Sequence, residues 1–147
     1  MKALRTLTAA MLTVAVIGCS DATTVEDVAD LVGTWNAASF LFVSDADPNV
    51  TFELIAEGGS FTLVIAADGS YTGNFAMGTE VETFSGTITI SGSNLVITDD
   101  LDPEDTSTVA FELNGNTLTM TDSDESFDFD DDGVEEDADS VMVLERQ

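Results

Sequence analysis

The sequence predicts an all-β fold, an eight-stranded antiparallel up-and-down β-barrel that starts near residue 33. Beyond that residue, runs rich in Val, Ile, Phe and Thr alternate with clusters of Gly, Asn, Asp and Ser. The clusters recur about every eight to twelve residues, which is typical of an all-β sandwich or barrel. Within the runs, apolar and polar side chains alternate, as where Phe84, Ile88 and Ile90 share one face of a strand. Such alternation gives each strand one face for a core and one for water.

The lengths of the connections favour a barrel over a sandwich. Short glycine-containing turns follow the second, fourth and sixth expected strands, at residues 67–70, 91–94 and 114–116. Longer connections follow the first, third, fifth and seventh strands. Because successive turns of a meander fall on opposite ends, the short turns lie at one end and the long loops at the other. A Greek-key sandwich would instead need long crossovers at both ends.

Taken in order, the expected strands cover residues 34–43, 60–66, 70–76, 81–90, 94–98, 107–113, 116–121 and 140–146. The segment 49–57, between the first two strands, fits either a short helix or a flap. Both prolines of the chain, Pro48 and Pro103, lie in acidic loops, so neither interrupts a strand.

The first 18 residues have the layout of a secretory signal. Lys2 and Arg5 form a basic start, and an apolar run follows from Leu7 to Gly18. This run is too short to span a bilayer. The sequence therefore predicts a signal peptide at 1–18, an acidic tether at 19–31 and the barrel domain at 32–147.

The end of the apolar run, "VIGC" from Val16 to Cys19, resembles the lipobox of bacterial lipoproteins. The resemblance implies that Cys19 is acylated, with palmitate-type chains, and becomes the first residue of the mature protein. Ser20, next to the cysteine, implies sorting to the outer membrane with the domain facing the periplasm. The inner membrane and the cell surface are the alternatives.

The charge of the chain excludes polyanionic partners. Three Lys and Arg stand against 29 Asp and Glu, and only Arg146 remains as a base once the signal is removed. Such a surface repels nucleic acid and attracts cations.

The residue types also argue against catalysis. Histidine is absent, Cys19 is the single cysteine, and Lys2 is the single lysine. Catalytic triads, imidazole bases and Schiff-base lysines therefore have no residues to build them. We expect a binding or structural protein and not an enzyme.

The segment "LVGTW", Leu31 to Trp35, resembles the G-x-W signature of lipocalins, and the chain from Leu31 to Gln147 resembles the lipocalin-like domains of bacterial lipoproteins. The resemblance implies that Trp35 sits at the closed end of the barrel and that Arg146 lies across it. A cation over an indole face contributes about 0.5 to 2 kcal/mol.

The barrel interior has two interpretations that the sequence leaves open. An eight-stranded barrel is just wide enough to hold one small ligand or to be filled by its own side chains. The residues expected to line a cavity are Phe61, Leu63, Tyr71, Phe75, Phe84, Phe111, Leu118 and Met120. No polar anchor for a ligand is evident among the inward positions.

The acidic segment near the C-terminus contains a candidate calcium loop. Asp128 to Gly133 spells D-x-D-x-D-G, in which alternate carboxylates wrap an ion and the glycine permits the sharp turn. The ligand positions of such a loop are Asp128, Asp130, Asp132, Val134, Glu136 and Asp139. Asp139 stands where a longer Glu usually closes the shell, and affinity is expected at ~0.1 to 1 mM. The alternative is a solvated acidic loop.

The position of the acids adds to this picture. Most carboxylates fall in or beside the four expected long loops, including eleven between Asp122 and Asp139. The sequence thus favours a lipid-anchored envelope protein that binds a small apolar ligand. Its alternative is a calcium-stabilised structural or interaction barrel with a filled core.

Overall fold

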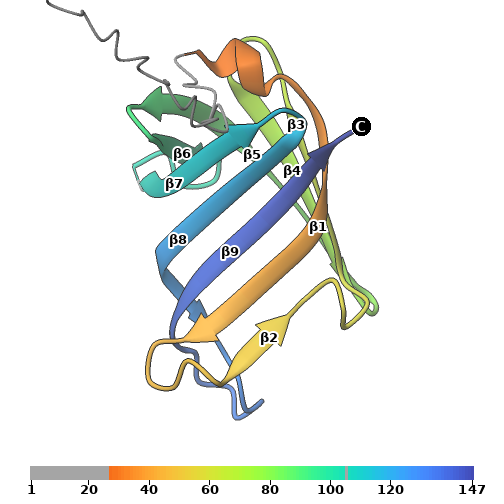
Figure 1. The fold of residues 1–147 in the computed structure, drawn as a ribbon, viewed down its shortest axis with the longest axis vertical. Coiled ribbons are helices and arrows are strands. Elements are labelled where there is room, and N and C mark those ends of the chain that lie inside the picture. Colours follow the sequence, from red (N-terminus) through yellow and green to blue (C-terminus); the bar gives the residue numbers. More distant parts are fainter. Residues whose placement is uncertain (1–26, 105) are drawn as a thin grey trace, which may run out of the picture.

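In the computed structural model, which describes residues 27–104 and 106–147, the strands form one antiparallel sheet that closes on itself (Figure 1). The pairing of the first strand with the last completes the barrel. The elements are a 3-10 helix η1 (Val28–Leu31) and the strands β1 (Gly33–Ser44), β2 (Thr51–Glu53), β3 (Ser60–Ile65), β4 (Ser70–Met77), β5 (Glu80–Ser91), β6 (Asn94–Asp99), β7 (Thr106–Asn114), β8 (Thr117–Phe127) and β9 (Glu136–Arg146). The predicted eight-stranded antiparallel barrel is confirmed, with β2 as a short addition.

Strand β2 covers a seam in the barrel wall. β1 pairs with β3 only from Gly33 to Asn36, and farther along the same edge it pairs with β2. Between these pairings, the Glu53 carboxylate accepts a hydrogen bond from the Phe40 backbone N–H at 2.7 Å. Partial burial opposes ionisation of Glu53, but hydrogen bonds from Ala56 and Phe40 outweigh it and lower its pKa. The segment 49–57, for which the sequence left a helix or a flap open, is thus a short strand and a turn. They provide hydrogen-bond partners for the part of β1 that does not pair with β3.

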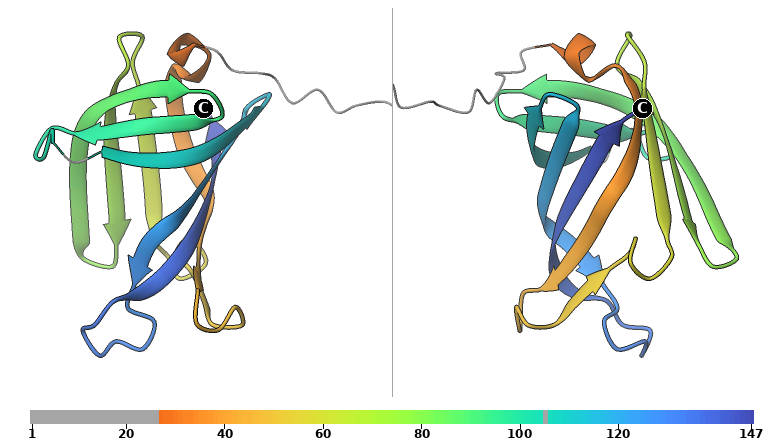
Figure 2. Two further views of the ribbon diagram at one scale, coloured as in Figure 1. Left: turned by 90° about the vertical axis from the view of Figure 1, so that its left-hand side faces the viewer. Right: turned by 45° about the vertical axis from the view of Figure 1, so that its right-hand side comes forward.

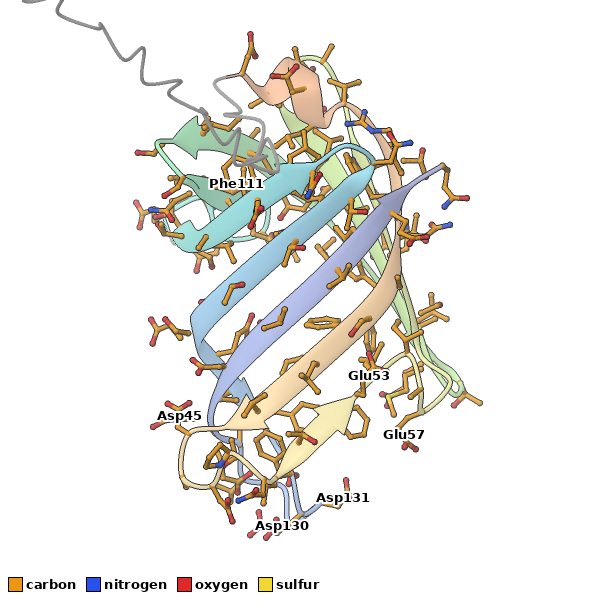
Figure 3. All side chains as sticks on the ribbon, in the orientation of Figure 1. Asp45, Glu53, Glu57, Phe111, Asp130 and Asp131 are labelled. Atoms are coloured by element: carbon orange, nitrogen blue, oxygen red, sulfur yellow. The ribbon has the colours of Figure 1, made fainter. Side chains whose placement is uncertain are left out.

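The two ends of the barrel differ (Figure 2). The tight turns after β3, β5 and β7 share one end with η1 and the C-terminus, while the β1–β2 and β8–β9 connections lie at the other. Figure 3 places Asp45, Glu57, Asp130 and Asp131 toward this second, open end. We call the first end the closed end.

The prediction of long loops is wrong at two places, after β4 and over residues 122–139. The connection after β4, expected to be long, is a two-residue turn, since Met77 pairs with Glu80 and Gly78 takes a φ of 60° that favours glycine. The acidic segment 122–139 is largely strand, because β8 runs to Phe127 and pairs with β9 from Glu136 onward. Only residues 128–135 form the loop. Acidic side chains are tolerated on these strands where they face solvent.

The core fills the closed half of the barrel. Leu31, Trp35, Ile65, Ile88, Leu95, Leu118 and Leu144 are the largest fully buried side chains. Leu31 belongs to the domain and not to the tether, because η1 packs Val28 and Leu31 against this core. No helix among the described residues is long and apolar enough to cross a membrane.

Trp35 and Arg146 close the barrel floor in the manner that the resemblance implies. The Arg146 guanidinium carbon lies 4.3 Å from the centroid of the Trp35 ring. Arg146 also donates to the backbone carbonyls of Val32 at 2.5 Å and Asp30 at 2.6 Å. The indole N–H donates to the Leu31 carbonyl at 2.8 Å. These contacts fasten η1 to both the first and the last strand.

Candidate ligand cavity

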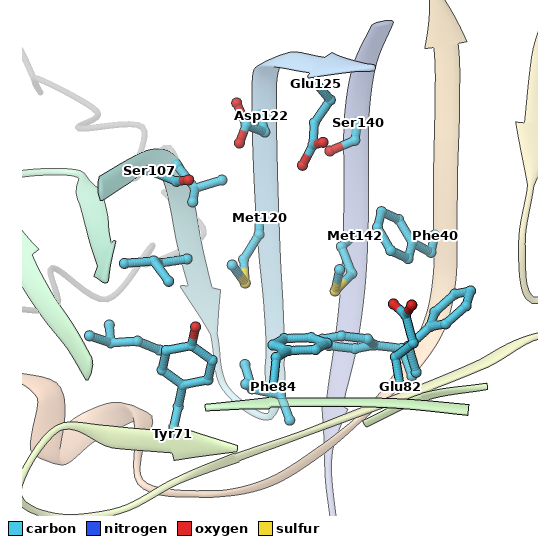
Figure 4. Close-up of a pocket in the computed structure, with 16 residues that line it drawn as sticks. Phe40, Tyr71, Glu82, Phe84, Ser107, Met120, Asp122, Glu125, Ser140 and Met142 are labelled. Carbon is cyan, nitrogen blue, oxygen red and sulfur yellow. The ribbon is translucent and has the colours of Figure 1, made fainter. Parts of the chain in front are cut away.

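A cavity of about 370 Å³ lies inside the barrel on the open side of the core (Figure 4). Its lining residues come from β1, β3 to β9, and most are apolar or aromatic. They are Phe40, Phe61, Leu63, Tyr71, Phe75, Glu82, Phe84, Ile88, Ile97, Ser107, Val109, Met120, Asp122, Glu125, Ser140 and Met142. Ligand pockets in proteins usually measure about 300 to 1,000 Å³ and are mainly apolar. The barrel is therefore not filled by its own side chains.

Most of the expected cavity residues lie around this space. Those that line it are Phe61, Leu63, Tyr71, Phe75, Phe84 and Met120. Leu118 is fully buried in the core and Phe111 is half-buried on β7, and neither lines the cavity. Both are inward positions of their strands, but they lie near the closed end, where the core is already packed. Period-two alternation finds the inward face of a strand, not the height along the barrel at which the core stops.

Aromatic rings form one wall of the cavity. The Phe84 ring centroid lies 5.8 Å from that of Phe61 and 6.3 Å from that of Tyr71. Phe40 meets Phe61 edge-on at 6.1 Å. The ring of Phe84 also covers Gly73 on the neighbouring strand, where a Cβ atom would come within 2.2 Å of it. Figure 4 shows Met120 and Met142 of β8 and β9 on the other side of the cavity.

Polar groups line the cavity as well, contrary to the expectation of an interior without polar anchors. Glu82 of β5 and Asp122 and Glu125 of β8 contribute carboxylates, and Ser107 and Ser140 contribute hydroxyls. A β-bulge between Asp122 and Glu125 explains why the sequence pattern does not predict Glu125 in the cavity, whereas Asp122 lies just beyond the end of the strand expected at 116–121. A regular strand would place residues 122 and 124 on one face, but the extra residue brings 125 to the cavity instead. The alternation of side chains along β5 does predict Glu82 at the cavity, since it lies two residues before Phe84 and therefore on the same face of the strand.

Tyr71 supplies a further polar group. Its side chain is buried in the cavity wall, and this burial, together with Asp99 and Asp100, raises the pKa of its hydroxyl. The phenol therefore stays protonated at neutral pH and can donate a hydrogen bond to an occupant of the cavity.

Glu125 has the most perturbed environment of the three cavity carboxylates. Its side chain keeps contact with solvent, but partial burial of the carboxyl group and the nearby charge of Asp122 raise its pKa. A hydrogen bond from the Ser126 backbone opposes the shift, and Asp124 and Glu135 add to it. The Glu125 carboxylate thus lies beside other acids, and none of the charged groups that shift its pKa is a base.

The expected calcium loop brings three of its residues together. Asp128, Asp130 and Asp132 each offer a carboxylate oxygen within 4.8 Å of the others. Asp128 accepts hydrogen bonds from the backbone N–H groups of Asp132 at 3.2 Å and Gly133 at 2.8 Å. Gly133 has a φ of 85°, the left-handed conformation that the motif requires of its glycine.

Of the other expected ligands, Val134 stays in the loop, where its backbone N–H donates to Asp132 at 2.8 Å, while Glu136 and Asp139 belong to β9. Glu136 starts β9 and accepts a hydrogen bond from the Phe129 backbone at 3.0 Å. Asp139 lies farther along β9, where it pairs with Val43 of β1, and Val134 is exposed next to Gly133. Neither Glu136 nor Asp139 joins the three gathered aspartates. A long β9 takes Asp139 away from the loop, whereas the motif needs the chain to continue around the ion.

Aromatic contacts connect this loop to the barrel wall. The Phe127 ring stacks on Phe42 of β1 at 4.8 Å and on Phe52 of β2 at 4.7 Å, and it meets Phe129 at 5.0 Å. These rings hold the β8–β9 ribbon against β1 and β2 at the open end.

The expected lipidation site at Cys19 and the signal peptide at 1–18 lie outside the described residues.

Comparison with known proteins agrees with this geometry. A family model described as a lipocalin-like domain matches residues 31–120, from the start of the LVGTW segment to Met120 of the cavity. No curated protein and no solved structure gives a significant match. The matched region covers more than half of the chain and includes Trp35 and most of the cavity wall. The protein therefore belongs to the lipocalin-like domain family.

Proposed function

We propose that the protein binds a small apolar ligand inside its barrel and acts as a lipid-anchored binding protein of the bacterial cell envelope. The single observation that carries the binding proposal is the cavity of about 370 Å³ with its aromatic wall. Membership of the lipocalin-like family supports it, because such barrels are suited to hold one small molecule. The filled-core alternative does not account for this space.

Filling the cavity tests the binding proposal. Val109 is buried in the cavity wall, so Val109→Phe places a ring where a ligand would lie. We expect this variant to weaken the binding of N-phenylnaphthylamine, a neutral fluorescent probe, by about tenfold or more, which corresponds to about 1.4 kcal/mol. The measurement is a fluorescence titration of the probe.

The matched control is Val64→Phe, the same substitution at a residue of β3 that is 40% exposed. It should leave probe binding unchanged. Failure of the wild-type protein to bind the probe, or equal weakening by both variants, would contradict a ligand site in the barrel.

The anchor is proposed from the lipobox resemblance at Val16 to Cys19. Cys19→Ala should remove the acyl mass and move the protein from the membrane fraction to the soluble periplasmic fraction. Mass spectrometry of the purified chain and cell fractionation check this outcome, with Ser20→Ala as the control that keeps the cysteine. An unmodified Cys19 in the wild-type protein would contradict the anchor.

A calcium site in the β8–β9 loop is a second proposal, favoured by the gathering of Asp128, Asp130 and Asp132. Calcium at ten times its Kd should raise the free energy of unfolding by about 1.4 kcal/mol. The measurement is thermal or urea unfolding with calcium and with chelator. Asp130→Asn and Asp132→Asn should abolish the gain.

Salt provides the necessary control, because sodium chloride at matched ionic strength screens repulsion between acids without binding specifically. Asp137→Asn, at an exposed position of β9, changes the net charge equally and should keep the gain. A stabilisation no larger than that from salt would rule out a specific ion.

A further inference from the structure

We infer that the ligand of the cavity is a cationic amphiphile, with an apolar body inside the barrel and a protonated amine or quaternary ammonium group at the carboxylates of Glu82, Asp122 and Glu125. The inference rests on the proposed binding function and adds the chemical class of the ligand. It starts from the lining of the cavity, where an apolar space and three acidic side chains meet.

The carboxylates lie on two separate parts of the wall. Glu82 belongs to β5, which pairs with β4 and β6, while Asp122 and Glu125 belong to β8, which pairs with β7 and β9. In Figure 4, Glu82 lies across the cavity from Asp122 and Glu125. A cation bound between these strands would therefore face negative charge from both sides.

No base among the described residues offsets these charges. Arg146 is the only Lys or Arg in residues 27–104 and 106–147, and it is held at the closed end by Trp35, Val32 and Asp30. An anionic head group, such as the carboxylate of a fatty acid, would meet like charge at the cavity without a partner. Glu82 and Glu125 are exposed to solvent and Asp122 is half-buried, so their charges should disfavour an anion at the cavity most strongly at low ionic strength.

The surroundings of Glu125 point the same way. Asp122 and Asp124 on β8 and Glu135 in the following loop are the acidic groups that raise its pKa, Glu82 on β5 faces it across the cavity, and the residue opposite it on β9 is Ala138. A bound cation would stabilise the ionised form that burial and these acids disfavour. Because the free protein holds the Glu125 proton to a higher pH than usual, affinity for the cation should fall as the pH is lowered through that raised pKa. Affinity for a neutral ligand should not follow this trend.

Three compounds with a ten-carbon chain distinguish the effect of the head group from that of the apolar chain. Decyltrimethylammonium, decanol and decanoate share the apolar chain and differ in charge, and each can compete with N-phenylnaphthylamine for the full-length protein. At low ionic strength we expect the ammonium compound to displace the probe at a concentration about tenfold or more below that needed for decanoate, with decanol between them. Glu125→Gln and Asp122→Asn should each lower the ratio of the displacing concentration of decanoate to that of decyltrimethylammonium.

The control variant is Glu112→Gln, which removes the same charge from an exposed position of β7 outside the cavity lining. It should keep the wild-type ratio. Displacement by decanol with no preference for the cation would overturn this inference and leave the proposed function standing. Equal loss of the ratio in Glu112→Gln would overturn it too, because general surface charge would then be the cause. No binding of the probe or of any decyl compound would overturn both.

Discussion

Replacing Trp35 with alanine is expected to lower the free energy of unfolding by about 5 kcal/mol. Trp35 is fully buried, and truncation of a buried Trp typically costs about 3 to 5 kcal/mol. The variant also loses the hydrogen bond to Leu31 and the ring beneath Arg146. Since small domains are stable by about 5 to 15 kcal/mol, much of this variant should be unfolded. Urea unfolding followed by circular dichroism measures the loss. Tryptophan fluorescence cannot be used, because Trp35 is the only tryptophan and the variant lacks it.

Two further variants make the test specific. Trp35→Phe keeps most of the buried volume but removes the indole N–H, and should cost about 1 to 3 kcal/mol. Leu101→Ala truncates an apolar side chain that is 90% exposed and should change stability by less than about 0.5 kcal/mol. A Trp35→Ala protein as stable as Leu101→Ala would show that the barrel floor does not depend on the indole.

Gly86→Ala is expected to destabilise the barrel by about 3 kcal/mol, near the upper end of the usual cost of overpacking. A Cβ atom at Gly86 would lie 1.9 Å from the backbone oxygen of Thr98 and 2.9 Å from Cε1 of Tyr71. Gly86 pairs with Tyr71 on β4 and with Asp99 on β6, so the backbone itself would have to move. Glycine inside a strand often marks such a close approach. Thermal and urea unfolding measure the effect.

Thr87→Ala is the matched control, because Thr87 is the exposed neighbour of Gly86 on the same strand. Its loss of a β-branched side chain should cost at most about 1 kcal/mol. If Gly86→Ala were no more harmful than Thr87→Ala, the close approach of β5 and β6 would not be a constraint on the fold.

The sequence was sufficient for the eight main strands and the closure of the barrel, but not for β2, for the tight turn after β4 or for the full length of β8 and β9. Alternating side chains identify the inward faces of β3 to β8, and the short turns identify the closed end. These features depend on local chemistry, such as glycine in a turn and period two in a strand. The pairing of Trp35 with Arg146 came from resemblance, because no local pattern connects residues so far apart in the chain.

The polar part of the cavity could not be obtained in the same way. Dense acid predicts a loop, yet β8 and β9 continue through it because their backbones pair and Phe127 packs on Phe42 and Phe52. The bulge that turns Glu125 toward the cavity leaves no mark in the residue pattern. Tertiary pairing therefore decided both the length of β8 and the direction of its acidic side chains.

Methyl NMR of methionine is the most direct test of the central claim, which is that the barrel cavity binds an apolar ligand. Met120 and Met142 line the cavity, and Met77 ends β4 outside its lining. In a titration of methyl-labelled protein with decanol, the signals of Met120 and Met142 should shift in a saturable way and show contacts to the ligand, while that of Met77 should not. Shifts at Met77 alone, or none at Met120 and Met142, would contradict binding inside the barrel.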